Sequence, residues 1–515
     1  MPRKKQTPQH PVPPDGELRF DAEWLDAFGP GDLLPPSLAR WRALLVEGLL
    51  HFLNRLPAQR RAEIIAAQFA LGLGASAAER LVALLQQCPT LHKLGQVVAR
   101  QPHLDAALRS RLVGLESMPA DVDVQPIVGR LRSQLAGTSK LAIADAALAQ
   151  GSVAVVLPFS WRARGATRQG VFKALRPGVE EKLRDELALL PDVAFFLGRR
   201  GAELDLPPLD YAGILEGVGR LLAEEIRLDH EQANLREAAV FHTDDNRISV
   251  PRLLPWCAPW VTAMERVHGA ALADATLSAA ERAAFATTAM SALLAKPFWT
   301  RDDPAVFHGD LHGGNLFVTP EGRLAVLDWA LTARVTKRQR EAVVAALIGA
   351  LTLDATQMRC ALAALGAVAS DERLLAEHVE RALDSLVMQG RPAGFDWLLA
   401  LLDTIALDAR IHFDAQLSVF RKTWMSLAGV LTDLAGSAVP DTVLMDAGIR
   451  AFAGDWPRRW LPVAGTGSYA SHIANADLAA AMTAGCFVGM RYWQRVWGRS
   501  IRAGGRVFGQ SEHTP

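Results

Sequence analysis

The chain has few cysteines, few tyrosines and no excess of charge of either sign, and each shortage excludes a class of protein. Its 515 residues include three tyrosines and four cysteines, Cys88, Cys257, Cys360 and Cys486. Cysteines so scattered have neither zinc-site nor disulfide-framework spacing, so we expect reduced thiols in a cytoplasmic protein. Lysine plus arginine equals aspartate plus glutamate at 55 each. This balance gives no indication of nucleic-acid binding, and we expect no nucleic-acid partner.

Long apolar runs are also missing. The longest uncharged and mostly apolar stretches cover 342–353 and 478–490, which is shorter than the roughly 18 residues that a membrane-spanning helix needs. Residues 1–17 are basic and proline-rich but lack the apolar centre of a signal peptide, and we expect a disordered tail there. The sequence therefore predicts no transmembrane helix.

Apolar residues with helical spacing are abundant. Half of the residues are hydrophobic and 21% are charged, which favours a mainly helical globular protein of two or three domains. Apolar residues at three- and four-residue spacing predict helices over 21–115 and again over 335–434. Between them, 150–157 has the pattern of a small-residue turn entering a strand, 170–175 that of a strand, and 211–241 that of a long helical run. Two further strands are predicted near 247–253 and 260–264.

One motif indicates phosphoryl transfer. Asp310 lies in the run Phe-His-Gly-Asp-Leu-His-Gly-Gly-Asn of 307–315, so Asn315 follows it by five residues, and Asp328 ends a predicted strand. Phosphoryl transfer needs one carboxylate to orient the acceptor, and an amide with a second carboxylate to hold Mg²⁺ against ATP phosphates. Asp310 suits the first role; Asn315 and Asp328 suit the second. The alternative is a structural turn capped by these side chains.

A lysine within a predicted strand points to the same chemistry. Lys173 has apolar neighbours in the strand 170–175, and a buried lysine is costly unless a carboxylate or a phosphate pairs with it. Glu224, Glu225 and Glu231 in the following helical run are the candidate partners. The alternative is a lysine at an exposed strand edge.

The end of the chain alternates aromatic and basic residues at helical spacing over 490–502. Such a helix can lie on an anionic membrane surface, which would make the protein peripheral to the inner membrane. The alternative interpretation, which the sequence favours, is a packed terminal helix with a solvated basic face.

Together these segments resemble the UbiB/AarF family of atypical protein-kinase-like proteins, which includes the ADCK and coenzyme Q proteins of mitochondria. The resemblance covers about 93–330, nearly half of the chain. It rests first on Lys-Leu-Gly-Gln at 93–96, which is similar to the family's KxGQ. Five further segments are similar to the family's nucleotide loop (150–154), its strand lysine with Arg-Pro-Gly-Val (173–179), its helix Glu-Ala-x-Asn (231–234), its hinge (264–269) and its catalytic loop (308–315). By their chemistry alone, Lys93 and Gln96 would be ordinary surface residues.

The resemblance implies ATP and Mg²⁺ as cofactors. It implies that Lys173 contacts the α and β phosphates with Glu231 holding it, that Asp310 is the catalytic carboxylate, and that Asn315 and Asp328 bind the metal. It also implies that Gly151 and Ser152 form the nucleotide loop and that Met264, Glu265 and Arg266 lie along the adenine. A further segment, with Lys93, Gln96 and Glu225, would fold over the active site.

The chain departs from the family pattern in several places. Arg227 follows Glu225 where the family has an acidic residue, which changes the charge near the metal. Gly151 stands where alanine is common and Val155 where glutamine is usual. Asp328 is followed by Trp-Ala instead of Phe-Gly, and the family's C-terminal membrane helices are missing. These departures place the family's inhibited geometry and its lipid partners in question.

We therefore expect an α+β, bilobal protein-kinase-like fold with N- and C-terminal helical extensions. The predicted parts are a disordered tail (1–17), a helical extension with KxGQ (18–140), a β-rich lobe (141–265), a helical lobe (266–435) and a terminal helical extension (436–515). The leading hypothesis is an Mg²⁺-dependent kinase or ATPase acting on a small or lipid-like acceptor, in support of ubiquinone or other isoprenoid-lipid metabolism. The alternatives are a nucleotide-binding pseudokinase scaffold and an aminoglycoside- or choline-type phosphotransferase.

Overall fold

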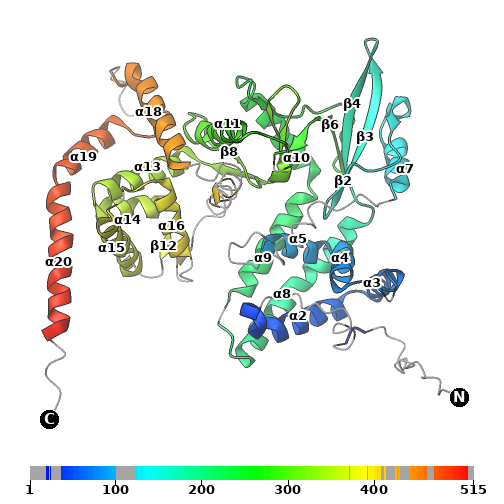
Figure 1. Ribbon diagram of the computed structural model, residues 1–515, viewed down its shortest axis with the longest axis horizontal. Helices are drawn as coiled ribbons and strands as arrows, with labels where there is room; N and C mark the ends of the chain where they lie inside the picture. The colour runs from blue at the N-terminus through cyan, green and yellow to red at the C-terminus, as the bar shows by residue number, and fades with distance from the viewer. Residues whose placement is uncertain are drawn as a thin grey trace. The chain divides into compact units, whose positions relative to one another are not determined.

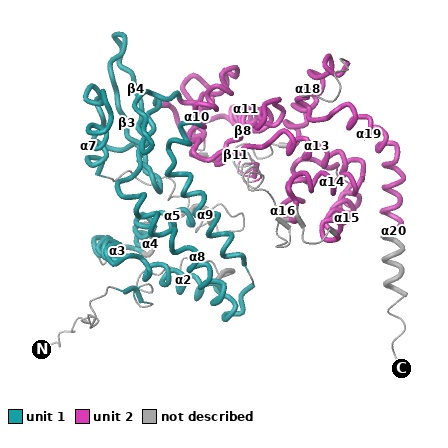
Figure 2. The backbone as a smooth tube through the Cα atoms, turned by 180° about the vertical axis from the view of Figure 1, so that it is seen from behind, with its two compact units in different colours: residues 1–233, 252–266 teal, residues 234–251, 267–515 magenta. Residues whose placement is uncertain are grey.

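A computed structural model of the chain describes most of its residues and divides them into two compact units (Figure 2). The described residues are 19–21, 24, 36–72, 74–99, 123–207, 209–272, 274–311, 313–369, 372–390, 392–406, 411–412, 421, 424–425, 427, 429, 440–460 and 469–508. Unit 1 comprises 1–233 and 252–266, and unit 2 comprises 234–251 and 267–515. The predicted tail lies outside the described residues, and the predicted domain boundaries stay predictions.

Unit 1 begins with short helices, as the proline-punctuated pattern predicts. They are η2 (Pro36–Trp41), α2 (Arg42–Arg55), α3 (Ala58–Ala70), α4 (Ala77–Gln87) and α5 (Pro89–Ala99). Helix α4 starts with a capping box in which the Ser76 hydroxyl accepts from the Glu79 amide and the Glu79 carboxylate accepts from the Ser76 amide. Helix α5 starts at Pro89. Proline lacks a backbone N–H, but the N–H groups of a first turn have no acceptor within the helix, so no helical hydrogen bond is lost.

An antiparallel sheet follows, in the order β1-β3-β4-β6, with β2 also paired to β3. Its strands are β1 (Ala142–Ile143), β2 (Ala149–Gln150), β3 (Ala154–Ala163), β4 (Ala166–Leu175) and β6 (Val261–Glu265). Strands β3 and β4, of ten residues each, form a hairpin whose turn is Arg164 and Gly165, with φ angles of 52° and 78°. Two consecutive positive φ angles match the strand twist at a two-residue turn. The turn entering a strand predicted at 150–157 and the strand predicted at 170–175 are confirmed.

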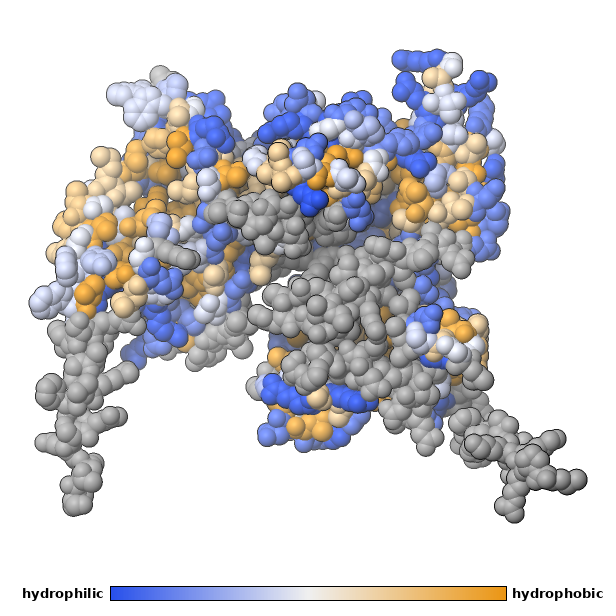
Figure 3. All heavy atoms as spheres, viewed as in Figure 1, coloured by the Kyte–Doolittle hydropathy of each residue, from blue (hydrophilic) through white to orange (hydrophobic). Residues whose placement is uncertain are grey.

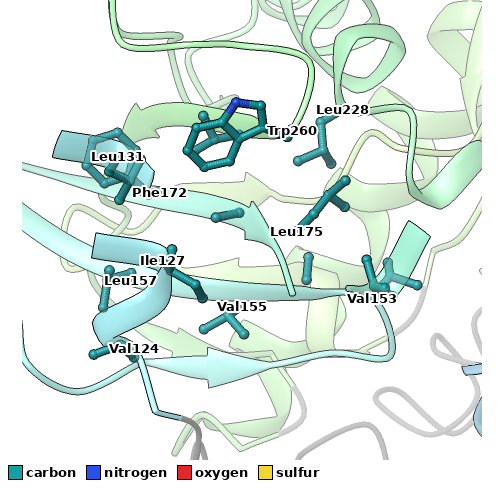
Figure 4. Packing of buried hydrophobic residues seen from close by; sticks show 14 of the residues in the cluster. Val124, Ile127, Leu131, Val153, Val155, Leu157, Phe172, Leu175, Leu228 and Trp260 are labelled. Atoms are coloured by element: carbon teal, nitrogen blue, oxygen red, sulfur yellow. The ribbon is translucent and has the colours of Figure 1, made fainter. Parts of the chain in front are cut away.

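Helices pack on this sheet and build the core of unit 1. They are α7 (Gln125–Gln134), α8 (Val179–Glu203), α9 (Tyr211–Glu225) and α10 (Leu228–Phe241), with the short η4 (Thr138–Lys140). Figure 4 shows Ile127 and Leu131 of α7 against Val155, Leu157 and Phe172 of the sheet. The run predicted as one helix over 211–241 is two helices, broken at 226–227.

Helix α8 contributes to two hydrophobic clusters. Its first turns place Val179 and Leu183 in the sheet core. Later turns place Leu190, Val193 and Ala194 among the residues of α2, α3 and α4. One 25-residue helix thus supports both the sheet and the N-terminal helices, and Figure 1 shows α8 beside α2 and α9.

The described residues of unit 2 form three small sheets. A four-stranded sheet has the order β5-β10-β9-β7, and β8 pairs with β11, β12 with β13. Their bounds are β5 (Ile248–Ser249), β7 (Ala270–Ala271), β8 (Ala305–His308), β9 (Leu316–Val318), β10 (Leu324–Val326), β11 (Thr332–Val335), β12 (Val368–Ala369) and β13 (Ile411–His412). The predicted hairpin of 316–327 is confirmed. The strand expected near 247–253 in the β-rich lobe is instead β5, which pairs with β10 in unit 2.

The rest of unit 2 is helical, as predicted. Its helices are α11 (Ala279–Met290), η5 (Ser291–Ala295, a π-helical segment), α12 (Lys296–Phe298), η6 (Gly313–Asn315), α13 (Lys337–Leu351), α14 (Ala355–Ala364), α15 (Glu372–Gln389), α16 (Phe395–Ala406), α18 (Pro440–Arg459), α19 (Asn475–Cys486) and α20 (Val488–Phe508). Within the described ranges, none of the helices is both long and apolar enough to cross a bilayer.

A buried arginine fixes the segment that leads into β8. Arg340 of α13 is fully buried and donates through Nη1 to the carbonyl oxygens of Phe298 (3.0 Å) and Thr300 (2.6 Å), and through Nη2 to that of Asp302. The His472 Nε2 also donates to the Phe298 carbonyl at 2.5 Å. These bonds hold the chain immediately before the strand that carries His308.

Candidate functional site

Lys173 and Glu231 form an ion pair in unit 1. Lys173 lies on β4, opposite Val156 and Thr262 of its neighbouring strands, and its Nζ lies 2.8 Å from Glu231 Oε1 of α10. The Glu231 side chain is almost fully buried, and that of Lys173 retains a small exposed part. A carboxylate held in this way fixes the direction of the ammonium group. Of the three candidate glutamates, the structure brings Glu231 to Lys173.

Lys93 is buried in a second ion pair, which contradicts the expectation of a surface lysine from its chemistry alone. Lys93, on α5, is 5% exposed, and its side chain pairs with Glu225 Oε1 at the end of α9. The other Glu225 oxygen accepts a hydrogen bond from the Ser152 hydroxyl at 3.1 Å. One carboxylate thus ties α5 to the nucleotide-loop serine. Gln96 lies on α5 one turn after Lys93.

Arg176 also supports the loop of Gly151 and Ser152, a role that was not predicted from the sequence. Arg176, the arginine of Arg-Pro-Gly-Val, donates through Nη1 to the Ser152 carbonyl oxygen at 3.3 Å, and its burial lowers its pKa. The Gly151 amide donates to the Ala154 carbonyl at 2.8 Å. A Cβ at Gly151 would lie 3.6 Å from that oxygen, so an alanine fits there. The Arg-Pro-Gly-Val motif was the available signal for Arg176.

The buried end of α5 is also held by charge. Glu186 of α8 is fully buried, accepts from the Thr90 amide at 2.9 Å and lies 2.8 Å from Arg60 Nη2. Burial raises the pKa of Glu186, although its hydrogen bonds and Arg60 favour the charged form. The Glu186 carboxylate serves as the N-terminal cap of α5, the helix that carries Lys93.

The predicted hinge is the end of β6. Met264 pairs in register with Val171, and the Arg266 amide donates to the Gln169 carbonyl at 3.3 Å. Glu265 is exposed and its amide donates to the Arg252 carbonyl at 2.9 Å. These residues form the border of the sheet that carries Lys173, so their backbone is fixed by strand pairing.

In unit 2, the three predicted catalytic and metal positions meet around one peptide, that of Leu327. The Leu327 amide donates to the Asn315 carbonyl at 2.8 Å, and its carbonyl accepts from His308 Nε2 at 2.9 Å. The Asn315 Nδ2 donates to the Asp310 carbonyl at 3.0 Å, and the Asp310 amide to His308 Nδ1 at 3.2 Å. The residue before Asp328 is thus locked to the loop that carries Asp310 and Asn315.

Close backbone approach at Gly309 permits this arrangement. The Gly309 amide donates to the Leu331 carbonyl at 2.8 Å. A Cβ at Gly309 would lie 2.9 Å from that oxygen and 2.7 Å from the Leu331 side chain, so a larger residue would force the two segments apart.

Asp328 has the backbone conformation of a turn, with a φ of 56°. This left-handed conformation is uncommon outside glycine, asparagine and aspartate. Trp329, which follows, is buried, and its carbonyl accepts from Asn234 Nδ2 at 3.1 Å. The Asn234 oxygen accepts from Arg334 Nη2 at 3.2 Å, and Arg334 pairs with Glu237 at 2.7 Å. Asn234 therefore positions the segment after Asp328, a role that the sequence did not indicate.

The donor set fits Mg²⁺. The Asn315 amide nitrogen is used in its bond to Asp310, so the amide oxygen is the atom that would ligate a cation. Mg²⁺ prefers oxygen ligands and is usually held by one or two carboxylates together with nucleotide phosphates. In the described part of the chain, no group of three or more histidine, cysteine, aspartate and glutamate side chains forms another metal site.

Arg227, the basic residue at an acidic family position, is accommodated locally. It is exposed and lies 3.2 Å from Asp229. This pairing raises the pKa of Arg227 and lowers that of Asp229. The added positive charge is therefore partly balanced by its neighbour on the following helix.

Comparison with known proteins identifies the segment that contains most of these residues. Residues 139–362 match the ABC1 atypical kinase-like domain. The chain is 28% identical over 280 residues to the probable protein kinase UbiB of Xanthomonas euvesicatoria, with 50% of this chain and 48% of that protein covered. It is 26% identical over 292 residues to the chloroplastic protein ACTIVITY OF BC1 COMPLEX KINASE 1 of Arabidopsis thaliana, with coverages of 55% and 42%.

These matches span about half the length of the curated relatives. Among solved structures, the complex of Rv3197 with erythromycin from Mycobacterium tuberculosis aligns with 69% of this chain and 90% of that chain, at 17% identity and a TM-score of 0.43.

Proposed function

Because this chain carries an ABC1 atypical kinase-like domain and has the UbiB and aarF-domain kinases as relatives, we propose that it is a UbiB-like atypical kinase or ATPase that binds ATP with Mg²⁺. The domain match confirms the predicted family resemblance and the predicted α+β kinase-like fold. The network around the Leu327 peptide carries the proposal, because its hydrogen bonds join the residue before Asp328 to the loop of Asp310 and Asn315, and phosphoryl transfer uses these residue types.

Each residue has a defined task in this proposal. Lys173, oriented by Glu231, would donate to the nucleotide phosphates. Asn315 and Asp328 would hold Mg²⁺, which supplies positive charge against the phosphate oxygens when it is bound. Asp310 would accept the proton of the attacking hydroxyl or water. Its position is set by His308, whose Nδ1 accepts from the Asp310 amide.

We base the proposed class of acceptor on the segment that contains Lys93. The Lys93–Glu225–Ser152 contacts bring α5 to the nucleotide loop, which supports a small or lipid-like acceptor, or water, rather than a protein substrate. We propose a role in ubiquinone or other isoprenoid-lipid metabolism on the strength of the UbiB relatives.

A pseudokinase scaffold is the second candidate. The buried Trp329, which follows Asp328 where the family has phenylalanine, favours it. The basic Arg227, at a position where the family has an acidic residue, also favours it. Binding of ATP without turnover would distinguish this candidate from the first.

The test is Mg²⁺-dependent ATP binding and turnover by the purified chain and its variants. We expect Asp310→Asn to bind ATP but lose turnover, Asp328→Asn to lose Mg²⁺-dependent binding, and Lys173→Ala to bind ATP more weakly. Lys140→Ala and Asp446→Asn change exposed residues of the same types and serve as controls. Wild-type binding and turnover in both Lys173→Ala and Asp328→Asn would overturn the assignment, whereas ATP-dependent thermal stabilisation of the wild type without turnover would select the scaffold.

A further inference from the structure

The predicted terminal extension of the chain contacts the segment that precedes β8. Trp299, in this segment, donates through Nε1 to the Leu444 carbonyl oxygen of α18 at 2.9 Å. Its indole ring also stacks on the ring of His472, with the ring centroids 5.6 Å apart and the two planes 16° from parallel. Leu444 lies 145 positions after Trp299, so a late part of the chain holds the segment that leads into β8.

Two further contacts hold the same segment. His472 Nε2 donates to the Phe298 carbonyl at 2.5 Å, and Arg301 Nη2 lies 2.7 Å from Oδ1 of Asp455 on α18. Asp455 is fully buried, and its Oδ2 accepts from the amide of Ser471 at 2.9 Å and from its hydroxyl at 2.8 Å. One buried carboxylate thus joins the segment before β8 both to α18 and to the residues that follow it.

We call helix α18 and residues 469–472 the C-terminal clamp, and Gly448 of α18 permits its close contact with Trp299. A Cβ at Gly448 would lie 2.7 Å from Trp299 Cζ2. Atoms in a packed interior do not approach so closely, so a larger residue would displace either the indole ring or the helix. Alanine is a better helix former than glycine. We therefore attribute this glycine to the ring contact and not to the stability of α18.

The clamp uses one side of α18. Leu444, Gly448 and Asp455 lie on that side, at helical spacing. On another side, Ile449 and Trp456 are 65% and 50% exposed, and Figure 3 shows hydrophobic residues at the surface where Figure 1 labels α18. Substitutions elsewhere on the helix can therefore serve as controls for substitutions on the side that contacts Trp299.

The segment that the clamp holds leads directly into the site of unit 2. Strand β8 starts at Ala305 and ends at His308. His308 bonds to the Leu327 carbonyl through Nε2 and to the Asp310 amide through Nδ1. A displacement of the chain before β8 would therefore be transmitted along the strand to His308 and Asp310.

We propose that the C-terminal clamp positions Asp310 for phosphoryl transfer, and that Trp299 is the positioning residue through which it acts. This inference rests on the proposed function, in which Asp310 accepts the proton of the attacking group. A misplacement of about 1 Å can lower the rate of a reaction about a hundredfold. A small shift of β8 would thus lower turnover and leave the Lys173–Glu231 pair of unit 1 unchanged. A clamp that only stabilised the fold would instead lower the amount of folded protein, and the folded molecules would keep their full activity.

The end of the same extension contacts a different part of unit 2. Arg491 lies 2.7 Å from Asp354, and Arg495 lies 2.8 Å from Glu380 and 2.9 Å from Asp384 of α15. These contacts contradict the predicted alternative, a packed aromatic helix with a solvated basic face, because the described arginines of α20 pair with the protein. Arg495→Gln removes contacts of the extension that do not involve the segment before β8, and it is therefore a second control.

The experiment compares Gly448→Ala with Gly454→Ala in the full chain. A Cβ at Gly454, also on α18, would meet nothing within 4 Å, so only the first variant crowds Trp299. The measurements are the stoichiometry and affinity of ATP binding, the Mg²⁺-dependent turnover per bound ATP, and hydrogen exchange in peptides that cover 305–311. We expect Gly448→Ala to bind ATP as the wild type does, to lose about tenfold in turnover per bound ATP and to exchange faster in 305–311. Gly454→Ala and Arg495→Gln are expected to match the wild type.

A second pair of variants makes the test independent of Gly448. Trp299→Leu removes both the ring and the donor, and we expect it to lose turnover per bound ATP as Gly448→Ala does. Trp299→Phe keeps a ring against His472 and is expected to recover part of this loss. Wild-type turnover per bound ATP in both Gly448→Ala and Trp299→Leu would overturn the proposal, as would a loss that is fully explained by fewer ATP-binding molecules.

Hydrogen exchange separates this proposal from the proposed function. A wild type that does not turn over ATP would overturn the proposed function. Exchange in 305–311 would then decide on the clamp alone, because it reports the order of β8 without any nucleotide. Faster exchange in Gly448→Ala than in Gly454→Ala supports the clamp, and equal exchange in the two variants overturns it.

Discussion

Arg340 offers a sharp test of how unit 2 supports strand β8 and the loop of Asp310 that follows it. Its guanidinium donates to three main-chain carbonyls in 298–302, directly before β8, and it has no exposed surface. Burial lowers its pKa to about 10, so the group is still charged at neutral pH. Arg340→Met keeps an apolar stem of similar length and removes all of the donors.

The expected cost follows from these bonds. Hydrogen bonds from a charged donor contribute about 1.5 kcal/mol each at the low end, which gives about 4.5 kcal/mol for three. Burying the neutral methionine avoids desolvation of a charge and offsets part of this loss. The Phe298 carbonyl also retains its bond from His472. We therefore expect unit 2 to lose about 3 kcal/mol of its free energy of unfolding.

Urea unfolding combined with amide hydrogen exchange measures this change. Exchange in peptides that cover 296–308 reports unit 2 locally, which matters because two units need not unfold together. Arg338→Met is the matched control, because Arg338 lies two residues earlier on α13 and is exposed. A loss below about 1 kcal/mol, or unchanged exchange in 296–308, would refute a supporting role for the Arg340 bonds.

Two further predictions concern buried polar groups of unit 2. Burial lowers the pKa of His242 and His472 from 6.5 to about 4, so both are neutral in the native state at neutral pH. Their contribution to the free energy of unfolding is complete above pH 6.5 and is lost as the pH falls toward 4. The loss reaches about 3 kcal/mol for each histidine. Urea midpoints between pH 7.5 and 5 measure this loss, and an unchanged pH dependence in His242→Gln would contradict it. Asn234→Ala leaves the buried Trp329 carbonyl without its donor and Arg334 without one acceptor. We expect a loss of about 1–2 kcal/mol in stability and a higher Mg²⁺ requirement for ATP binding; a titration with an unchanged Mg²⁺ requirement would exclude the positioning role.

The local structure around Asp310 and Asp328 could be predicted because its parts are close in sequence. The strand before Asp310, the hairpin 316–327 and Asp328 lie within some twenty residues, and turn residues mark each boundary. The bonds that align them run from the His308 side chain and the Leu327 peptide to main-chain atoms, and a sequence pattern does not show such bonds.

Long-range pairs were harder to predict. The sequence left Glu224, Glu225 and Glu231 open as partners of Lys173, and the structure assigns Glu231 to Lys173 and Glu225 to Lys93. Lys93 lies 132 residues before its partner, so its own neighbours indicate only a surface lysine. Only the resemblance to UbiB/AarF proteins marked that position in advance.

The pairing of β5 and the orientation of α20 also depend on contacts between residues far apart in the sequence. Strand β5 has two residues, too few for a period-two pattern, and its partner β10 lies about 75 positions later. The contacts of α20 with Glu380 and Asp384 join residues more than 100 positions apart. The amphipathic pattern of α20 predicted two faces but could not decide which of them faces the protein.

Helix α8 has a practical consequence for anyone who shortens this chain. A fragment that starts at 123 would keep the sheet but lose the helices that cover Leu190, Val193 and Ala194. The second half of α8 would then present an apolar surface to water, and aggregation would follow although the domain boundary looks convenient in an alignment. Expression of the kinase-like region alone should therefore retain α2–α5, or replace these three side chains with polar ones.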